Sequence, residues 1–450
     1  MILIKLEWIR LNDTEQYRLM FQILDIQTPE AERFLNKLNE RGRLTDEDIL
    51  KTVRRTLSDV QDEGDKAVAR YTRKFDAPRL TSKGLRVQPK EFKNAYSEVK
   101  EDFIDAIKHA KKNIQDFHQK QIRSSWFSTE QDGVLLGHII NPLKRVGVCV
   151  PSVSQLLVSS LLMSVVPAKV AGVEEIVVCM GPMRNRQINP HMLVAAAECE
   201  IDEIYKCGGA QAVGAMAYGT ETISPVDKIV GPGNLYVQLA KKEVYGYVDI
   251  DKLAGPSEIL VIADSTADPD YVAADLISQA EHGPECSAIL ITTSRGFAEQ
   301  VKAAVEIQAR TFPRQYELVK AFENYGGAFL VNDIDEAIDL TNNIAPEHVE
   351  LHLEDPFDRI GHIRNAGAIL IGPYSPEAVG DYIAGPNHIL PTGRAARYAS
   401  PLSVDDFLKK TSLISYTKTA LEKVTPDAVE LAQIEGLEGH AAALRIRFEE

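Results

Sequence analysis

The sequence predicts an α/β protein made of two doubly wound parallel-sheet domains, with small helical units at the N- and C-terminal ends. Three observations support this fold class. Short β-rich runs alternate with helical runs in two series, and two glycine-rich stretches, "KIVGPGNLY" and "KLAGPSE", join the two series. Charged segments with helical periodicity come before the first series and return after about Ser400. Strand–helix alternation at this spacing predicts parallel sheets with helices on both faces.

The segment from Thr28 to about Lys120 is charged and helical in pattern. "TPEAERFLNKLNERG" opens with a threonine N-cap followed by proline in the first turn, and it closes with glycine. "TDEDILKTVRRTLSDVQDEGDKAVARYTRKFD" repeats apolar residues at spacings of three and four. We expect these helices to cover other parts of the protein.

The two series then follow in order from Arg145. The first contains "RVGVCV", "QLLVSSLLMSVVPAKVAG", "EEIVVCM", "HMLVAAAECE" and "EIYKCGG". The second contains "SEILVIAD", "PDYVAADLISQAEHG", "SAILITTS", "GFAEQVKAAVEIQART", "GAFLVND", "DEAIDLTNNIA" and "GAILIGP". Ligands collect at the carboxyl ends of the strands in such sheets. The unusual stretches "VGPGN", "APEHVE" and "GPYSPEAVGDYIAGPNHILPTG" fall in those loops. A G-x-G-x-x-G motif is absent from the sequence, so a standard dinucleotide phosphate turn is not predicted.

Composition excludes several classes of protein. The chain has 450 residues, 44% of them hydrophobic, enough for two or three compact units. A formal net charge of −15, spread along the chain, argues against a nucleic-acid or anionic-membrane binder. "MILIKLEWIRLND" lacks the features of a signal peptide, and serines, Pro167 and Lys169 interrupt the longest apolar stretch. Five cysteines without C-x-x-C spacing suggest a reducing cytoplasm.

The stretch "DLISQAEHGPE" carries the first candidate site residues. On a helix, residues three apart share a face, so Gln279 and His282 can converge on one ligand, whereas Glu281 points away from Gln279. Gly283 and Pro284 are typical of a helix end. The alternative is a solvated last turn in which the helix dipole favours His282. Spacing alone leaves both interpretations open.

The stretch "APEHVELHLEDP" alternates apolar and polar residues and predicts a half-buried strand. Glu347 and His348 then lie at its entrance, after the turn at Pro346. An imidazole titrates near neutrality and an adjacent carboxylate can adjust it, so this pair is a candidate for acid–base chemistry. Two polar surface residues would produce the same pattern.

Further candidates lie in a long loop and in the tail. Asp381 and His388 occur in "EAVGDYIAGPNHILPTG", a loop rich in glycine and proline, and such loops are usually functional. Glu435 and His440 occur in the tail stretch "IEGLEGHAAALRIRFEE", where a histidine is normally a cap or surface residue. Two imidazoles and two oxygen donors form a set that suits zinc. That set is Gln279, His282, Asp381 and His440.

Several of these stretches resemble histidinol dehydrogenase, in order and with similar spacing, from about residue 30 to the C-terminus. They are "VGPGNLYVQLAKKEVYG", "DIDKLAGPSEILVIAD", "LISQAEHGPE", "APEHVELH" and "SPEAVGDYIAGPNHILPTG". The resemblance implies the aldehyde and histidinol dehydrogenase fold, with two Rossmann-like domains. We therefore expect an N-terminal helical segment at 1–44, a catalytic zinc domain from 45–148 with 258–400, an NAD-binding domain at 149–257, and a C-terminal dimer-swapped unit at 401–450.

The resemblance also implies a function and a set of roles. Enzymes of this family are zinc-dependent homodimers that oxidise L-histidinol through L-histidinal to L-histidine in histidine biosynthesis, consuming two NAD. Gln279, His282, Asp381 and His440 match the zinc ligands, with His440 coming from the other subunit, and these four also contact substrate. Glu347 and His348 match the acid–base pair. Ser257, His388 and Glu435 match substrate contacts, and His348 matches a substrate contact as well as the base. Gln211 and Asn234 match NAD contacts.

One loop departs from the family pattern. After the first strand of the cofactor domain the family usually reads Tyr-(Ile/Val)-Pro-Gly-Gly, whereas this chain reads "CVPSV" at 149–153, followed by "QLL" at 155–157. Serine and valine restrict the backbone where glycine permits close approach to a ligand. A working histidinol dehydrogenase, a dehydrogenase of the same fold acting on another small alcohol, and a zinc-containing pseudoenzyme that binds NAD poorly all remain compatible with the sequence.

Overall fold

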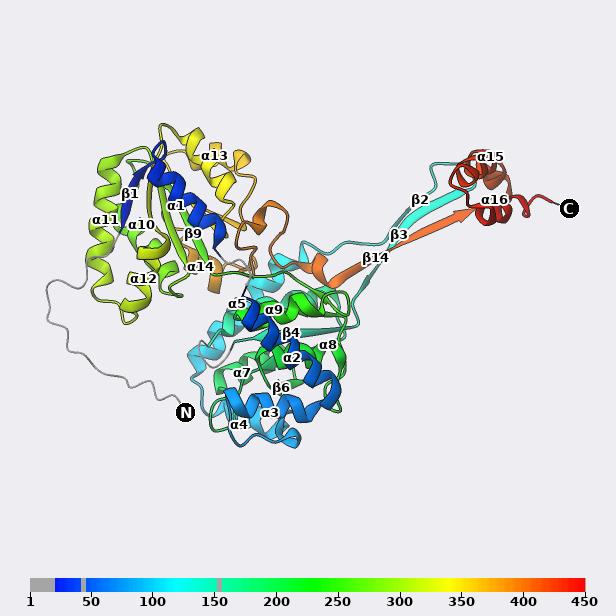
Figure 1. Ribbon diagram of the computed structural model, residues 1–450, viewed down its shortest axis with the longest axis horizontal. Coiled ribbons are helices and arrows are strands. Elements are labelled where there is room, and N and C mark those ends of the chain that lie inside the picture. Colours follow the sequence, from blue (N-terminus) through cyan, green and yellow to red (C-terminus); the bar gives the residue numbers. More distant parts are fainter. Residues whose placement is uncertain (1–20, 42–45, 152–155, 450) are drawn as a thin grey trace.

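The computed structural model describes residues 21–41, 46–151 and 156–449. Two lobes, each built on a parallel sheet covered by helices, lie side by side, and a long arm extends from one of them (Figure 1). The α/β class with two doubly wound parallel sheets is therefore confirmed. Residues 152, 153 and 155 of the departing loop lie outside the described residues.

The first lobe contains a six-stranded sheet in which all neighbouring strands are parallel. In spatial order the strands are β1 (Gln22–Asp25), β11 (Gly326–Leu330), β10 (Ser287–Thr292), β9 (Glu258–Ala263), β12 (His348–His352) and β13 (Ala368–Ile371). One apolar layer joins the sheet to α10 (Pro269–Ala280), α11 (Arg295–Ala309) and α12 (Gln315–Tyr325). The other joins it to α1 (Pro29–Glu40) and α13 (Ile334–Ile344). Because helices cover both faces, the central strands are completely buried.

The N-terminal segment is more than the helical unit expected for 1–44. Its β1 pairs with β11, with Ile23 opposite Ala328, and so forms an edge of the six-stranded sheet. Thr28 caps α1 as predicted, since its hydroxyl oxygen accepts a hydrogen bond from the Ala31 amide at 3.3 Å. The strand was missed because four residues are too few to establish a period in the sequence.

The second lobe contains a five-stranded parallel sheet. Its order is β6 (Ile204–Lys206), β5 (Glu175–Met180), β4 (Arg145–Val150), β7 (Lys228–Val230) and β8 (Asp249–Ile250). One face packs against α2 (Glu47–Glu63), α3 (Asp65–Phe75), α8 (Gly209–Tyr218) and α9 (Leu235–Val244). The other packs against α4 (Pro89–Tyr96), α5 (Glu101–Gln119), α6 (Val158–Ala171) and α7 (Pro190–Glu198).

This packing differs from the domain boundaries that we expected. Residues 45–148 were assigned to the lobe of 258–400, but α2 to α5 all pack on the five-stranded sheet. Leu57 and Val60 of α2 face α8, and Ile114 of α5 lies in the layer that includes α6. Strand β4 also belongs to this sheet from Arg145 onward. An amphipathic helix identifies its apolar face in the sequence but not the sheet that will cover it.

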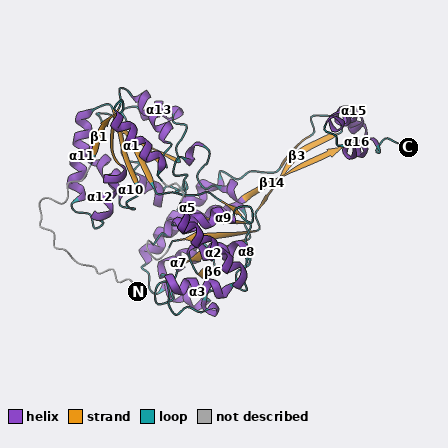
Figure 2. Ribbon diagram, viewed as in Figure 1, coloured by secondary structure: helices purple, strands orange, loops and turns teal. Residues whose placement is uncertain are grey.

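The arm is a β-ribbon that ends in two helices (Figures 1 and 2). Strand β3 (Val134–Pro142) pairs antiparallel with β14 (Leu408–Tyr416) and with β2 (Trp126–Ser128). Beyond β14 come α15 (Lys418–Ile434) and α16 (Glu438–Arg445). We expected helices and polar turns after about residue 400, and β14 was not predicted. Its residues are mostly exposed, so the apolar alternation of a half-buried strand is absent.

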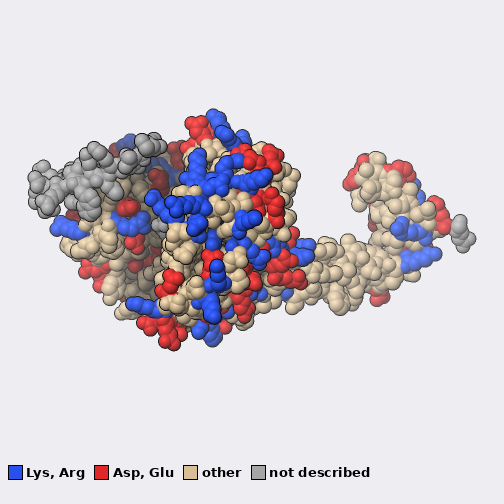
Figure 3. Space-filling view, turned by 90° about the horizontal axis from the view of Figure 1, so that it is seen from below, with Lys and Arg blue, Asp and Glu red and all other residues tan. Residues whose placement is uncertain are grey.

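Three further features of the structure concern the distribution of charge, membrane-spanning helices and the cysteines. Figure 3 shows charges of both signs spread over the lobes, whereas the ribbon of the arm carries few. None of the helices in the described residues is both long and apolar enough to cross a membrane. All five cysteines are buried and free.

Candidate active site

Strand β12 carries three polar side chains on one face. Residues two apart on a strand point the same way, so His348, Glu350 and His352 lie on one side and Val349 and Leu351 on the other. The apolar pair packs in the layer formed with α1 and α13. All five residues are buried, so the strand is not half-buried as the alternation predicted. Helices on the second face of the sheet, α10 and α14 (Glu377–Tyr382), cover the polar side chains.

Hydrogen bonds to the start of β9 hold Glu347 and His348 in place. The Glu258 amide donates to Glu347 Oε2 at 2.9 Å, and the Glu347 amide donates to Glu258 Oε2 at 3.0 Å. His348 Nδ1 lies 3.2 Å from the Glu258 carbonyl oxygen. A carbonyl can only accept, so Nδ1 carries the proton and Nε2 is the basic nitrogen. Both side chains are buried, which excludes the interpretation as polar surface residues.

Burial also sets the protonation of this pair. It lowers the pKa of His348 to about 4, so the imidazole is neutral near pH 7. Burial, together with the nearby Glu258 carboxylate, raises the pKa of Glu347 well above its ordinary value. A neutral imidazole with a free Nε2 can accept a proton, and a carboxyl group of raised pKa can both take and return one.

Helix α14 adds two carboxylates beside His348. Glu377 and Asp381 are four residues apart and therefore share a face of the helix. His348 Nδ1 lies 3.8 Å from Glu377 Oε1, and His348 Nε2 lies 3.9 Å from Asp381 Oδ1. From α10, the completely buried Gln279 turns its amide nitrogen to Glu377, at 2.6 Å from Oε1 and 2.8 Å from Oε2. Sequence reasoning missed Glu377, although its spacing from Asp381 was visible.

His282 and His388 border this group from two loops. Helix α10 ends at Ala280, and His282 lies exposed just beyond it, with Nδ1 3.2 Å from the Ser278 carbonyl oxygen. His388 has Nδ1 2.9 Å from the Asp381 carbonyl oxygen and Nε2 3.1 Å from Ser160 Oγ of α6. Both imidazoles lie close enough to lower the pKa of His348. His388 thus connects the group to the second lobe, through a serine that sequence analysis did not identify.

The donors in this group fit a zinc ion. Imidazole nitrogens and carboxylate or amide oxygens are zinc ligands. Such donors lie around His348 on two segments: α10 with the turn after it, which carries Gln279 and His282, and α14, which carries Asp381. Ligand atoms of His348, Glu377 and Asp381 lie within 4.8 Å of one another. Their separations of 3.8 to 3.9 Å exceed hydrogen-bond lengths. Burial and the neighbouring carboxylate of Asp381 raise the pKa of Glu377 well above its ordinary value, and a bound cation would offset this clustering of negative charge.

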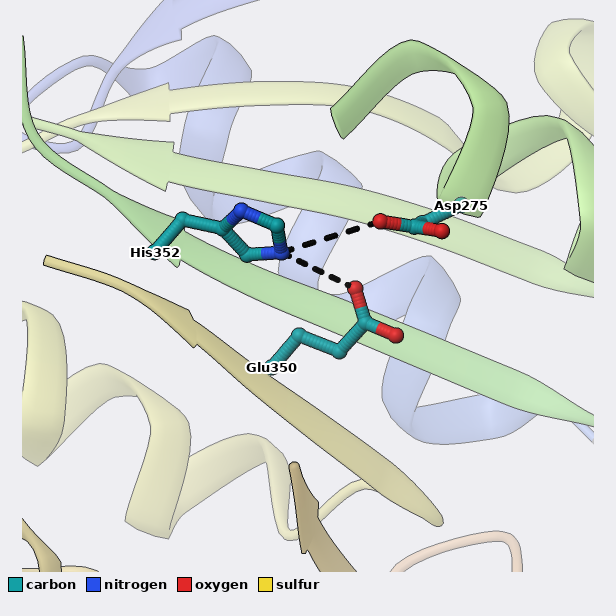
Figure 4. Close-up of side chains that lie close together, drawn as sticks. All are labelled: Asp275, Glu350 and His352. Atoms are coloured by element: carbon teal, nitrogen blue, oxygen red, sulfur yellow. Dashed lines mark hydrogen bonds and ion pairs between the residues drawn. The ribbon is translucent and has the colours of Figure 1, made fainter. Parts of the chain in front are cut away.

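A second group of buried ionisable side chains lies further along the same face of β12, and Figure 4 shows its members Asp275, Glu350 and His352. His352 Nε2 is 3.4 Å from Glu350 Oε2 and 3.6 Å from Asp275 Oδ2 of α10. Burial and Glu350 raise the pKa of Asp275 to about 8, and burial raises that of Glu350 to about 7. Burial lowers the pKa of His352. The backbone amide of Glu377 donates to Glu350 Oε1 at 2.8 Å and so joins the two groups.

The predicted NAD contacts lie in the second lobe. Gln211 is near the start of α8, after β6, and Asn234 caps α9, after β7, where its Oδ1 accepts from the Val237 amide at 3.3 Å. Strand order reverses between β4 and β7, and in doubly wound sheets ligands bind at that crevice. Gly231, at the end of β7, has φ +106°, and a Cβ there would collide with the Cys149 carbonyl oxygen. The backbone therefore requires glycine at this position.

The remaining predicted residues divide between the site and the arm. Ser257 immediately precedes β9, and its carbonyl oxygen accepts from the Ser287 amide at 3.1 Å. Glu435 and His440 are exposed on the helices at the far end of the arm, remote from the other site residues of the same chain (Figure 1). The structure thus brings together the candidates from the first lobe and His388, but not the two in the tail.

Comparisons with known proteins identify the family of this chain. Residues 39–448 match the family model described as histidinol dehydrogenase. The chain is 50% identical over 413 residues to a histidinol dehydrogenase from Bacillus cereus, covering 92% of this chain and 96% of that protein. It is 51% identical to one from Moorella thermoacetica over 91% and 96% of the two chains.

A solved structure is also similar to this chain. The crystal structure of histidinol dehydrogenase from Elizabethkingia anophelis is similar with a TM-score of 0.89 and 37% identity, over 95% of this chain and 98% of that one. The match spans both lobes and the arm. The chain therefore belongs to the histidinol dehydrogenase family of oxidoreductases.

Proposed function

We propose that this protein oxidises L-histidinol to L-histidine through L-histidinal, with a zinc ion in the group around His348 and two NAD as successive hydride acceptors. The main support is the buried, neutral His348, whose Nδ1 donates to the Glu258 carbonyl oxygen and whose Nε2 is left basic beside Asp381. A base placed beside a cation site suits the oxidation of an alcohol that carries metal-binding nitrogens.

The residues that would hold zinc are Gln279, His282 and Asp381, completed by His440 of the partner subunit. Zinc, when bound, would supply Lewis-acid binding of the substrate's amine and imidazole nitrogens. Ser257, His388 and Glu435 of the partner subunit would orient the rest of the substrate. Holding the carbinol carbon against the nicotinamide in this way favours the reaction by fixing its geometry.

His348 Nε2 would then accept the hydroxyl proton, and NAD, when bound, would supply the acceptor for the hydride of the carbinol carbon. The second oxidation requires the aldehyde to be hydrated, and Glu347 takes the proton from the attacking water. The raised pKa of Glu347 suits a group that must take up and return a proton. Burial of both residues limits access of bulk water to the aldehyde.

We place NAD at the crevice of the five-stranded sheet, against Gln211, Asn234 and the turn at Gly231. The reversal of strand order between β4 and β7 supports this placement, because ligands bind at that crevice in doubly wound sheets. His388, hydrogen-bonded to Ser160 at 3.1 Å, lies where the two lobes meet. A nicotinamide reaching across from the second lobe would meet the substrate there.

We further propose that the protein is a homodimer in which each arm completes the partner's site. Large apolar side chains on the arm, including Phe127, Ile414 and Ile434, are exposed in the single chain. An exposed apolar surface of this kind is typical of a subunit interface. Glu435 and His440 are also exposed and remote from their own chain's site, as this exchange requires.

The reaction is tested by titrating the zinc-loaded protein with NAD and then with L-histidinol in a calorimeter, while NADH absorbance is recorded on mixing. We expect both ligands to bind and two NADH to form per histidinol. Histidinol binding without NAD binding would instead indicate a pseudoenzyme. NADH formation with another alcohol from a panel, but not with histidinol, would indicate a different substrate.

Mixing two inactive variants tests the exchange of arms. A heterodimer of His348→Gln and His440→Ala subunits contains one intact site, made from the body of one chain and the tail of the other. Random reassociation should therefore restore about a quarter of the wild-type activity. Verified heterodimers that remain inactive would show that the tail acts on its own chain.

A further inference from the structure

Arg41 lies outside the site described above, yet its side chain reaches to the base of that site. It forms the C-cap of α1, and its side chain is only 2% exposed. Nη1 donates to the Ser257 carbonyl oxygen at 3.2 Å and to the Glu285 carbonyl oxygen at 2.8 Å. Nη2 forms an ion pair with Glu258. The guanidinium also lies over the ring of Tyr325, 5.5 Å from its centroid.

Glu258 contacts both Arg41 and the acid–base pair, Glu347 and His348. Its Oε1 accepts hydrogen bonds from the Arg41 guanidinium and, at 3.0 Å, from the Gly393 amide. Its Oε2 accepts a hydrogen bond from the Glu347 amide at 3.0 Å. Its own amide donates to Glu347 Oε2 at 2.9 Å, and its carbonyl oxygen accepts from His348 Nδ1 at 3.2 Å. Both backbone polar groups of Glu258 thus contact Glu347 or His348.

The chemistry of this arrangement calls for arginine. Glu258 and Glu347 are adjacent buried carboxyl groups, and a buried carboxylate is retained only when paired and hydrogen-bonded. The planar guanidinium has a fork of donors that can satisfy a carboxylate and two carbonyl oxygens from different loops at once. Lysine would bring the charge on a single, flexible nitrogen. These contacts join Arg41 to residues more than 200 positions away in the sequence, so they hold together loops that are distant along the chain.

We propose that Arg41 and Glu258 are positioning residues for the oxidation proposed above: Arg41 holds the Glu258 side chain in place, and Glu258 in turn fixes Glu347 and His348. The inference rests on the proposed function for its effect on turnover. The competing interpretation is a buried ion pair that only stabilises the first lobe. Local order around Glu347 distinguishes the two, because a purely stabilising pair would affect every strand of the lobe alike.

The first readout is backbone amide hydrogen exchange of the zinc-loaded protein, which does not depend on activity. In Arg41→Met and Arg41→Lys, we expect the segments containing the Glu258, Glu347 and Gly393 amides to exchange about tenfold faster or more, with β11 unchanged. Arg41→Lys keeps the charge and carries the test if Arg41→Met does not fold. Unchanged exchange at those amides, or an equal increase in β11, would overturn the proposal.

The second readout is turnover. In both Arg41 variants we expect kcat to fall about 10- to 100-fold, with KM for histidinol and NAD changed less than about threefold. Methylguanidinium added to Arg41→Ala should restore part of the lost kcat. Arg359→Met is the matched control, because it removes an exposed arginine–aspartate pair of the same lobe, and it should leave kcat unchanged.

The two readouts also separate failure of this proposal from failure of the proposed function. Wild-type protein that forms no NADH would refute the function, while the exchange data would still decide whether Arg41 orders the pair. A normal kcat in a folded Arg41→Met protein would overturn the positioning role even if the function holds.

Discussion

Strands β12 and β4 occupy similar places in the two lobes but differ in what they bury. Both are parallel, lie inside their sheets and are completely buried. Strand β4 buries Val146, Val148 and Val150 against α6 and its neighbours, whereas β12 buries His348, Glu350 and His352 against α10 and α14. The first lobe therefore carries buried ionisable groups on the sheet itself. The second keeps an apolar sheet and presents its candidate ligand contacts from the turns at the strand ends.

This difference has an energetic cause. Burying an imidazole or a carboxyl group is unfavourable unless partners satisfy it. On β12 the partners are supplied by Glu258, Asp275 and Glu377, which come from other segments of the same lobe. Such a strand can hold shifted protonation states that an apolar strand cannot. Mutations should accordingly act on chemistry in the first lobe and on backbone geometry in the second.

The largest effect is expected for His348→Gln. Glutamine retains an amide that can donate to the Glu258 carbonyl oxygen but has no group that accepts a proton at neutral pH. We expect kcat for NADH formation to fall by about 10² to 10⁴, the usual contribution of a general base. Zinc content, measured by elemental analysis, should stay near that of the wild type.

The control for this variant is His362→Gln, which changes an exposed histidine of the same lobe. It should leave NADH formation unaltered. If a folded, zinc-loaded His348→Gln protein kept near-normal turnover, the assignment of the base would be wrong, and the polar face of β12 would be structural only.

A smaller effect, on cofactor binding, is expected for Gly231→Ala in the second lobe. The backbone there has φ +106°, which alanine rarely adopts, and the added Cβ would collide with the Cys149 carbonyl oxygen. We expect the turn after β7 to shift and the Kd for NAD, measured by calorimetry, to rise about tenfold or more. The affinity for zinc should not change, since the residues around His348 lie in the first lobe.

Gly296→Ala serves as the control, because Gly296 lies in α11 with ample space around it. It should preserve NAD affinity. Normal NAD binding by Gly231→Ala would separate the cofactor site from this turn and would weaken the assignment of cofactor binding to the second lobe.

Sequence analysis identified those parts of the fold and site that depend on local pattern. Strand–helix alternation predicted both sheets. Helix spacing predicted that Gln279 and His282 share a helix face, but α10 ends at Ala280, so Gln279 is buried in the helix and His282 lies exposed beyond it. The full burial of β12 was not predicted, because alternating polar residues normally face solvent, and here α10 and α14 cover them. The assignment of α2 to α5 to the wrong lobe has a similar origin. Periodicity shows which face of a helix is buried but not what buries it.

The residues in or beside the site that sequence analysis missed share a different feature. Arg41, Glu258 and Glu377 make their decisive contacts with residues that are distant in the sequence, such as Glu347, or with a single side chain such as Gln279. Charged residues at helix ends and strand starts are common, so none of the three stood out. The proposed role of His440 came from family resemblance alone, since in one chain it lies at the end of the arm.

The smallest effect that we predict concerns the inner group on β12. Burial raises the pKa of Asp275 from 3.8 to about 8, so between about pH 4 and pH 8 the folded protein holds a proton that the unfolded chain has lost. Stability from this group is therefore fully present below about pH 4 and is lost as the pH rises toward 8. Asp275→Asn has no proton to release, so its free energy of unfolding should fall less steeply over this range.

Denaturant unfolding of the zinc-free protein at several pH values between 4 and 8 measures this slope, which for one proton cannot exceed about 1.4 kcal/mol per pH unit. Asp339→Asn, at an exposed position on α13, should keep the wild-type slope. Residual slope in Asp275→Asn is expected from Glu350, whose pKa burial raises to about 7. If Asp275→Asn and the wild type had equal slopes, Asp275 would be ionised in the folded protein. The polar face of β12 would then carry a full negative charge one helical turn of α10 from Gln279, and His352 would have to be protonated to balance it.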